Sequence, residues 1–209
     1  MSDGANSWDE RYRRGEHATL EPSRVLRRAV ELFRHQRDAE EPSSHPHAAQ
    51  RPRALDLACG AGRHALYLAA EGFRVTAVDA SRVGVDLMLR RAAERGLELE
   101  ARVADLERHE FLIEPEAYDL ICDFYYLQRD LFDEMRAGLR PGGLFAAAIH
   151  TTDERPGVRP MNPDFLLRPG ELAAAFRDWH ILHYHETRED DRDPGEHTRH
   201  TAELIARRP

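Results

Sequence analysis

The stretch Asp56–Arg63, DLACGAGR, constrains the fold more than any other part of the chain. It follows a short apolar run, Arg53–Leu57, and precedes a segment of helix-forming residues, Arg63–Glu71. Glycine has no Cβ, so Gly60 and Gly62 allow a sharp turn and a close approach of a ligand to the backbone. Exposed N–H groups at the start of the helix add a positive potential. The stretch therefore predicts a strand–turn–helix unit with a ligand at the turn.

The same alternation continues as far as residue 150. Apolar or alternating runs predict four more strands, separated by segments with helical patterns. The predicted strands span residues 73–78, 97–103, 118–123 and 144–149, and the predicted helices span residues 81–95 and 128–139. Ser81 suits an N-cap and Gly96 a C-terminal stop, while Pro141-Gly142-Gly143 is expected to separate the last helix from the last strand. Such alternation implies parallel strands joined by right-handed crossovers.

The flanking segments predict a helix before this core and a hairpin after it. Residues 22–38 have the pattern of an amphipathic helix, and a polar linker follows at 39–52. The tail is expected to contain a loop at 151–168, a short helix at 170–178, and two strands at 179–187 and 198–206 joined by an acidic turn at 189–196. Antiparallel strands suit such a connection.

Composition and charge restrict the class of protein. Of 209 residues, 41% are hydrophobic and 33% are charged, values typical of a globular chain. The formal net charge of −8 argues against a general binder of nucleic acid or of anionic membranes, which needs a basic face. Cys59 and Cys122 lack the spacing of a disulfide framework or a zinc site, and the first twenty residues lack a signal peptide's apolar core. We therefore expect a cytoplasmic protein with no membrane span and no nucleic-acid partner.

Carboxylates stand in or beside four of the predicted strands: Asp56, Asp79, Asp105 and Asp123. Open parallel sheets bind ligands at the carboxyl ends of their strands, so these side chains are candidates for a site. Asp79 ends the second strand, from where a carboxylate accepts hydrogen bonds from both hydroxyls of a ribose. The alternative is a structural turn followed by a helix-capping aspartate. Turn, strand and carboxylate together favour a site for a ribose-containing cofactor.

These motifs resemble the class I S-adenosylmethionine-dependent methyltransferases, in particular the small bacterial group of tellurite-resistance and thiopurine-type enzymes. The resemblance covers most of the chain, and it is carried by WDERY (8–12), ALDLACGAGR (54–63), VTAVDAS (75–81), ADLE (104–107), YDLICD (118–123) and LRPGG (139–143). It implies a Rossmann-like α/β fold with a seven-stranded, mostly parallel sheet, a C-terminal antiparallel hairpin and helices on both faces. The implied single domain, 1–209, has an N-terminal cap or lid segment and helix (1–40), a cofactor-binding core (53–150) and a substrate-side segment with the hairpin (151–209).

The resemblance implies S-adenosyl-L-methionine as cofactor and S-adenosyl-L-homocysteine as product. It places Asp56 near the cofactor's ammonium group, Asp79 at the ribose hydroxyls and Asp105 at the adenine amino group. The other implied contacts lie in the glycine turn, beside these carboxylates, at the end of the fourth strand or in the lid: Trp8, Tyr12, Ala58, Cys59, Gly60, Gly62, Ala80, Ser81, Leu106, Asp123 and Phe124. Ala58 is a departure, since many relatives have a first glycine there.

The methyl-transfer side is expected at the ends of the fourth and fifth strands. His150 ends the fifth strand, and histidine has the intrinsic pKa for proton transfer near neutrality. We therefore take His150 and Asp123 as candidate catalytic residues, with Tyr125, Tyr126, Arg129 and His150 as candidate acceptor-binding residues. The alternatives are a polar end of the strand for His150, packing for the tyrosines and a solvated helix position for Arg129.

Two features of the tail have weaker implications. The loop Arg155–Leu167 is expected to cover the acceptor, because long loops at this edge of a sheet usually carry function. His183 and His185 share one face of a predicted strand, with His197 and His200 across the hairpin, a set able to bind zinc or nickel. Such histidines more often decorate an exposed sheet face, so we expect no metal.

The predicted function is transfer of a methyl group by in-line displacement to a small molecule: a chalcogen oxyanion, a thiol or an aromatic heteroatom. We expect a monomer or a homodimer. One alternative is a non-catalytic S-adenosylmethionine-binding or sensor protein, which would use the same glycine turn. The other is an NAD-dependent reductase, which usually needs a further substrate domain, whereas only about sixty residues follow the fifth predicted strand.

Overall fold

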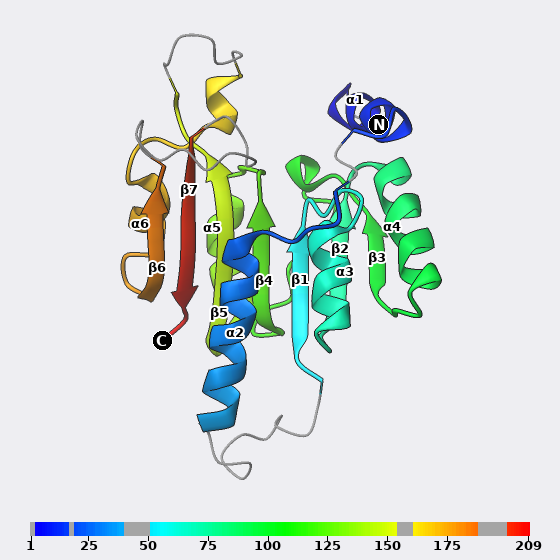
Figure 1. The fold of residues 1–209 in the computed structure, drawn as a ribbon. Coiled ribbons are helices and arrows are strands. Elements are labelled where there is room, and N and C mark those ends of the chain that lie inside the picture. Colours follow the sequence, from blue (N-terminus) through cyan, green and yellow to red (C-terminus); the bar gives the residue numbers. More distant parts are fainter. Residues whose placement is uncertain (1–2, 17–18, 40–50, 154–160, 188–199) are drawn as a thin grey trace.

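A seven-stranded sheet forms the middle layer of the fold, in the strand order β3-β2-β1-β4-β5-β7-β6 (Figure 1). The computed structural model describes residues 3–16, 19–39, 51–153, 161–187 and 200–209. Four predicted features lie wholly or partly outside these ranges: residues 40–50 of the linker expected at 39–52, residues 155–160 of the acceptor loop, the acidic turn and His197. The strands are β1 (Arg53–Leu57), β2 (Arg74–Asp79), β3 (Glu100–Val103), β4 (Tyr118–Phe124), β5 (Leu139–His150), β6 (His180–Glu186) and β7 (Thr201–Arg207).

Strand pairing confirms the predicted sheet. The pairs among β1 to β5 are all parallel, whereas β7 is antiparallel to both β5 and β6. The topology reverses between β1 and β4, because the chain runs outward from β1 through β2 to β3 and then returns to the other side of β1. A reversal of this kind is where open α/β sheets bind their ligands.

Helices cover both faces of the sheet (Figure 1). They are α1 (Asp3–Arg13), α2 (Arg24–Ala39), α3 (Arg63–Ala70), α4 (Arg82–Glu94), α5 (Leu131–Gly138) and α6 (Glu171–Ala175), with short 3-10 turns at Leu106–Arg108 and Pro163–Phe165. Side chains of α2, α3 and α4 share one buried apolar cluster, and those of α5 and α6 share another. Within the described ranges, no helix has the length and apolar character needed to cross a membrane.

The two apolar clusters follow from the period of the strands. Ala54 and Cys122 belong to the cluster under α2 and α3, whereas their strand neighbours Leu55 and Ile121 belong to the cluster under α5. Successive strand residues point to opposite faces, so a strand covered on both sides has a continuous apolar run. This is why β1 and β4 appear in the sequence as apolar runs, interrupted by one carboxylate in β1 and by two in β4.

The start of β5 differs from its prediction. We expected Pro141-Gly142-Gly143 to separate a helix from a strand starting at residue 144, but α5 ends at Gly138 and β5 begins at Leu139. Gly142 has φ +79° and its N–H donates to Arg208 O at 2.9 Å, while the β4–β5 register shifts between Tyr118 and Leu120. The irregular pairing lets the strand accommodate a proline that cannot donate to the ladder. The third strand and the helix after β5 are also shorter than predicted.

The glycine turn connects β1 to α3 through left-handed backbone conformations. Ala58, Gly60 and Gly62 have φ values of +50°, +55° and +84°. Cys59 N–H donates to Val78 O at 3.0 Å, which fastens the turn to the end of β2. The left-handed region costs an alanine about 1–2 kcal/mol, so Ala58 is a strained substitute for the glycine expected there. A Cβ at Gly62 would collide with the Met88 side chain of α4.

We expect opposite effects from exchanging alanine and glycine in this turn. Ala58→Gly should raise the free energy of unfolding by up to about 1 kcal/mol, because relief of the left-handed strain exceeds the entropic cost of glycine. Gly62→Ala should lower it by about 2–4 kcal/mol, since backbone strain and overpacking against Met88 add. Urea denaturation of the purified variants measures both changes.

Gly96→Ala is the matched control for these variants. Gly96 has a similar φ of +63° but no atom within 4 Å of its would-be Cβ, so the control isolates backbone strain from collision. Equal destabilisation by Gly62→Ala and Gly96→Ala would show that the contact with Met88 adds nothing.

Candidate active site at the carboxyl edge of the sheet

Asp79 connects the glycine turn to the start of α4. Its Oδ2 accepts a hydrogen bond from Gly60 N–H at 2.7 Å, and its Oδ1 accepts one from Ser81 N–H at 2.7 Å. Burial raises the pKa of this carboxyl, while the two backbone N–H groups oppose that shift. Each carboxylate oxygen has a second lone pair, so Asp79 retains acceptor capacity toward a ligand. The structure therefore places Asp79, Gly60 and Ser81 together, as the sequence predicted.

The N-terminal helix lies over this turn. In Figure 1, α1 sits above the side of the sheet formed by β2 and β3, and it packs against α4. A Cβ at Gly60 would collide with the Tyr12 hydroxyl, and one at Gly84 would lie 2.9 Å from the Tyr12 ring. Trp8 stacks on Tyr12 with ring centroids 5.9 Å apart. Sequence reasoning missed Gly84, although a glycine inside a predicted helix signals a close approach by another group.

Two buried carboxyls lie beside the turn with unused oxygens. Asp56 and Asp123 are 1% and 2% exposed, at the ends of β1 and β4. Cys122 Sγ donates to Asp56 Oδ1 at 3.3 Å, whereas Asp56 Oδ2 and Asp123 Oδ1 have no well-formed hydrogen bond within the described part of the chain. Buried acceptors of this kind are costly unless a donor reaches them, so they indicate a site for a donor-bearing ligand.

The surroundings of these carboxyls favour their neutral forms. Burial raises the pKa of Asp56 to about 7; the hydrogen bonds from Cys122 and the Ala65 amide oppose the shift, and the charge of Asp79 adds to it. Burial raises the pKa of Asp123 well above its usual range, and the charge of Asp56 raises it further. A cationic ligand group would reverse this preference for Asp56, because an opposite charge stabilises the carboxylate.

At the ends of β4 and β5, the predicted site residues Tyr125 and His150 lie together with Arg63, which the sequence did not single out. Tyr125 lies 5.2 Å from His150 between ring centroids, and the Arg63 guanidinium lies 5.5 Å from the centroid of the Tyr125 ring. Tyr125 has φ +64°, and its N–H donates to Ala148 O at 2.8 Å. Sequence reasoning did not identify Arg63, whose signal is its place directly after Gly62, at the first position of α3.

Tyr126 is separated from this group. Its hydroxyl donates to Gln128 Oε1 at 2.5 Å, and Gln128 Nε2 donates to Leu106 O at 3.2 Å. Tyr125 packs on the apolar cluster under α2 and α3, and Tyr126 packs on the opposite one. The two tyrosines therefore serve opposite faces of the sheet, and Tyr126 lies on the side of the predicted adenine contacts.

Arg129 forms its hydrogen bonds and its ion pair with the segment that follows β5. Its guanidinium forms a two-point ion pair with Glu171, with N–O distances of 2.5 and 3.0 Å. It also donates to Asp164 O at 2.9 Å and to Leu166 O at 3.0 Å. The pairing lowers the pKa of the Glu171 carboxyl. This geometry favours a role in positioning residues 161–171, where we had expected contact with an anionic acceptor.

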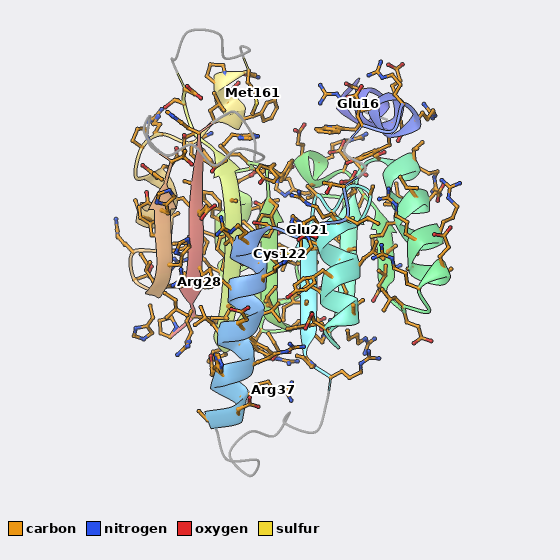
Figure 2. All side chains as sticks on the ribbon, in the orientation of Figure 1. Glu16, Glu21, Arg28, Arg37, Cys122 and Met161 are labelled. Atoms are coloured by element: carbon orange, nitrogen blue, oxygen red, sulfur yellow. The ribbon has the colours of Figure 1, made fainter. Side chains whose placement is uncertain are left out.

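The remaining predicted contacts occupy the same edge. Asp105 Oδ1 accepts from Glu107 N–H at 3.1 Å, which caps the 3-10 turn that contains buried Leu106. Ala80 is partly exposed beside Asp79. The Phe124 ring packs at a tilt against the ring of buried His64, with centroids 4.0 Å apart, and sequence reasoning missed His64. Figure 2 shows Glu16, just after α1, and Met161, in the segment after β5, on opposite sides of this edge.

The histidines of the tail have other partners. His183 Nε2 lies 3.1 Å from Glu203 Oε2, and its Nδ1 lies 3.1 Å from an Arg28 nitrogen. Among the residues that the structure describes, no group of three or more histidine, cysteine, aspartate or glutamate side chains is arranged to hold a metal ion. His197 lies outside these residues.

Curated proteins similar to this chain include two from bacteria. "Hemagglutinin 1" of Eikenella corrodens is 35% identical over 143 residues, which cover 64% of this chain and 46% of that protein. The "Probable S-adenosyl-L-methionine-dependent methyltransferase TehB" of Haemophilus influenzae is 29% identical over 143 residues, which cover 64% and 48%. The matched part spans about half the length of these relatives.

Solved structures confirm the class I methyltransferase fold. The crystal structure of TehB from Haemophilus influenzae has a TM-score of 0.69 and 21% identity, covering 96% of this chain and 67% of that one. A Burkholderia thailandensis 1,6-didemethyltoxoflavin N1-methyltransferase, with S-adenosylhomocysteine bound, has a TM-score of 0.62 and 19% identity, covering 98% and 86%.

A family profile covers the glycine turn, the strand-end carboxylates and most of the tail. The profile described as "Tellurite resistance protein TehB" matches residues 43–197, well over half of the chain. The chain belongs to the TehB tellurite resistance family.

Proposed function

We propose that this protein is an S-adenosyl-L-methionine-dependent methyltransferase that acts on a small-molecule acceptor. The observation that carries the proposal is the set of acceptor oxygens around the glycine turn. Asp56 Oδ2 and Asp123 Oδ1 have no well-formed hydrogen bond among the described residues, and Asp79 has spare acceptor capacity. The family and the printed name of the Haemophilus relative support the same cofactor. Structural neighbours with bound S-adenosylhomocysteine share the fold.

The residues present fit the chemistry of this cofactor. An ammonium group needs a buried anionic acceptor, and Asp56 Oδ2 supplies an oxygen that has no well-formed hydrogen bond within the described residues. Ribose hydroxyls need two acceptor oxygens at the end of β2, which Asp79 provides. An adenine ring needs apolar surface and an acceptor, which Leu106 and Asp105 would supply. Gly60 keeps the turn open to the backbone, because a side chain there would collide with Tyr12.

When bound, S-adenosyl-L-methionine supplies a methyl group on a sulfonium sulfur for in-line displacement. The protein holds the acceptor in line with that methyl, and positioning of this kind contributes roughly 7–11 kcal/mol to catalysis. Tyr125 and His150 form one wall of the acceptor side, at the ends of β4 and β5. His150 would take a proton from an acceptor that carries one. Arg63 adds a positive charge beside Tyr125, which favours an anionic acceptor such as a chalcogen oxyanion over a neutral heteroatom.

Calorimetric titration tests the cofactor. We expect micromolar binding of S-adenosylmethionine and S-adenosylhomocysteine and none of NAD. Asp79→Ala should weaken binding by about 1.5–3 kcal/mol, the range for hydrogen bonds to a charged group. Asp86→Ala, which removes an exposed carboxylate from α4, is the matched control and should bind as the unaltered chain does. NAD binding would contradict the proposal, and binding without turnover of any acceptor would favour a sensor.

The pH dependence of binding tests the role of Asp56. Its pKa of about 7 in the ligand-free chain means that the carboxyl must lose a proton before it pairs with an ammonium group. Affinity for S-adenosylhomocysteine should therefore fall as pH drops below about 7, by up to about tenfold per pH unit. Asp56→Asn should bind weakly at pH 8 and lose this dependence. Titrations from pH 5.5 to 8.5 measure both, and an unchanged slope in the variant would contradict the assignment.

The same shift has a consequence for stability. A carboxyl whose pKa is raised by folding stabilises the native state below its unfolded pKa of about 4, and this contribution is lost as pH rises to about 7. The ligand-free Asp56→Asn variant should therefore have a higher Tm than the unaltered chain at pH 8, and the gain should shrink at pH 4. Thermal unfolding at the two pH values measures it. If the Tm of Asp56→Asn were below that of the unaltered chain at pH 8, the inference that ionising the buried Asp56 carboxyl destabilises the ligand-free fold would be wrong.

Arg63→Gln tests the preference for an anionic acceptor. The variant removes the charge and keeps the polar character. We expect at least a tenfold higher KM for an oxyanion acceptor and a smaller change for a neutral thiol. Affinity for S-adenosylhomocysteine is compared at pH 8.5, where Asp56 is ionised in both chains, because the Arg63 charge also acts on Asp56. Product release with a panel of acceptors measures these constants, and equal effects on both acceptor classes would remove the charge argument.

A further inference from the structure

Asp9 anchors the N-terminal helix to α4. Its side chain is 13% exposed, although α1 lies at the surface. Asp9 Oδ1 accepts a hydrogen bond from Ser81 Oγ at 2.5 Å and another from Val83 N–H at 3.2 Å. Its Oδ2 lies 3.6 Å from Arg13, one helical turn along α1. A charged group thus joins α1 to α4 at two points.

The position of these contacts is electrostatically favourable. Ser81 is the N-cap of α4, where its Oγ accepts from Gly84 N–H at 3.0 Å. The first N–H groups of a helix have no partner within it and carry a partial positive charge, which stabilises a carboxylate there. Asp9 supplies that carboxylate from another helix. It accepts from Val83 N–H, whereas the Ser81 side chain accepts from Gly84 N–H.

A continuous path of hydrogen bonds leads from Asp9 to the glycine turn. Ser81 Oγ accepts from Gly84 N–H of α4 and donates to Asp9, and the Ser81 N–H donates to Asp79 Oδ1. Asp79 Oδ2 in turn accepts from Gly60 N–H. The anchor of α1 and the predicted ribose-binding carboxylate are therefore built on one helix start.

Asp9 also sets where the aromatic residues of α1 lie. Tyr12 follows Asp9 by three positions, so the two side chains share a face of α1. With Asp9 bonded at the start of α4, Tyr12 lies against Gly60 and Gly84. Trp8 stacks outside Tyr12 and is 41% exposed.

We propose that Asp9 is a positioning residue that latches α1 closed over the cofactor. It acts through Ser81 and Tyr12, and it needs no contact with the cofactor. The latch rests on the proposed function in one respect: the ligand whose residence it prolongs is S-adenosylmethionine or its product. The resemblance noted in the sequence implied a lid at Trp8 and Tyr12 but assigned nothing to Asp9, the residue that holds this lid on α4.

Three variants separate the latch from a general effect of charge. Asp9→Ala removes both hydrogen bonds and the charge. Asp9→Asn removes the charge but retains an oxygen that accepts from Ser81 and Val83, so it should restore part of the function. Glu10→Ala is the matched control, because the neighbouring Glu10 is exposed and has the same charge.

Two measurements read the latch. The first is the dissociation rate of S-adenosylhomocysteine by surface plasmon resonance, which should rise at least tenfold in Asp9→Ala, less in Asp9→Asn and not in Glu10→Ala. The second is limited trypsin digestion of the ligand-free chain, which reports on α1 through cleavage at Arg11, Arg13 and Arg14. Cleavage there should accelerate in the same order. The Tm of the variants should stay near that of the unaltered chain, because Ser81 still caps α4.

The outcomes distinguish the latch from the proposed function. Equal digestion and equal dissociation rates of Asp9→Ala and Glu10→Ala would overturn the latch, even with normal methyl transfer. Failure of the unaltered chain to bind S-adenosylhomocysteine would overturn the proposed function, whereas faster digestion of Asp9→Ala would still support the anchoring of α1 by Asp9. A large loss of Tm in Asp9→Ala would contradict a local role.

Discussion

The structure of the site depends on the Asp79 carboxylate. One oxygen holds the glycine turn through Gly60 N–H, and the other holds the start of α4 through Ser81 N–H. These two segments follow different strands, β1 and β2, and a single side chain fixes their relative position. Ser81 also donates through Oγ to Asp9 of α1. The placement of the N-terminal helix therefore depends on the Asp79 carboxylate as well.

A second constraint is the presence of carboxyls in the middle of an apolar sheet. Asp56 and Asp123 lie where the neighbouring positions of β1 and β4 are leucine, cysteine and phenylalanine. An apolar residue at either position would pack without an unsatisfied oxygen, so the carboxyls reduce stability in the ligand-free chain. Such departures from good packing concentrate at functional sites. The raised pKa of Asp56 follows from the same burial.

Two covering segments, one on each side of the core, converge on the site. From the N-terminal side, α1 reaches the glycine turn through Asp9 and Tyr12. From the other side, Arg129 and Glu171 hold the segment that follows β5, near the ends of β4 and β5. The core between them supplies Asp56, Asp79 and Asp123 from rigid strands. A rigid core with separate covering segments allows one fold to serve many acceptors.

The sequence by itself determined the sheet core and the strand-end carboxylates, because both depend on short-range patterns. Strand and helix periods predicted β1 to β4, and a carboxylate at the carboxyl end of a buried parallel strand lies at the edge of the sheet where ligands bind. The tertiary structure decided what depends on partners distant in the chain. Arg129 pairs with Glu171, and Asp9 bonds to Ser81. Tyr125 and Tyr126 pack on opposite faces of the sheet. Pro141 lies within β5. None of these contacts has a local signature, since each is made between elements brought together only by the folded sheet.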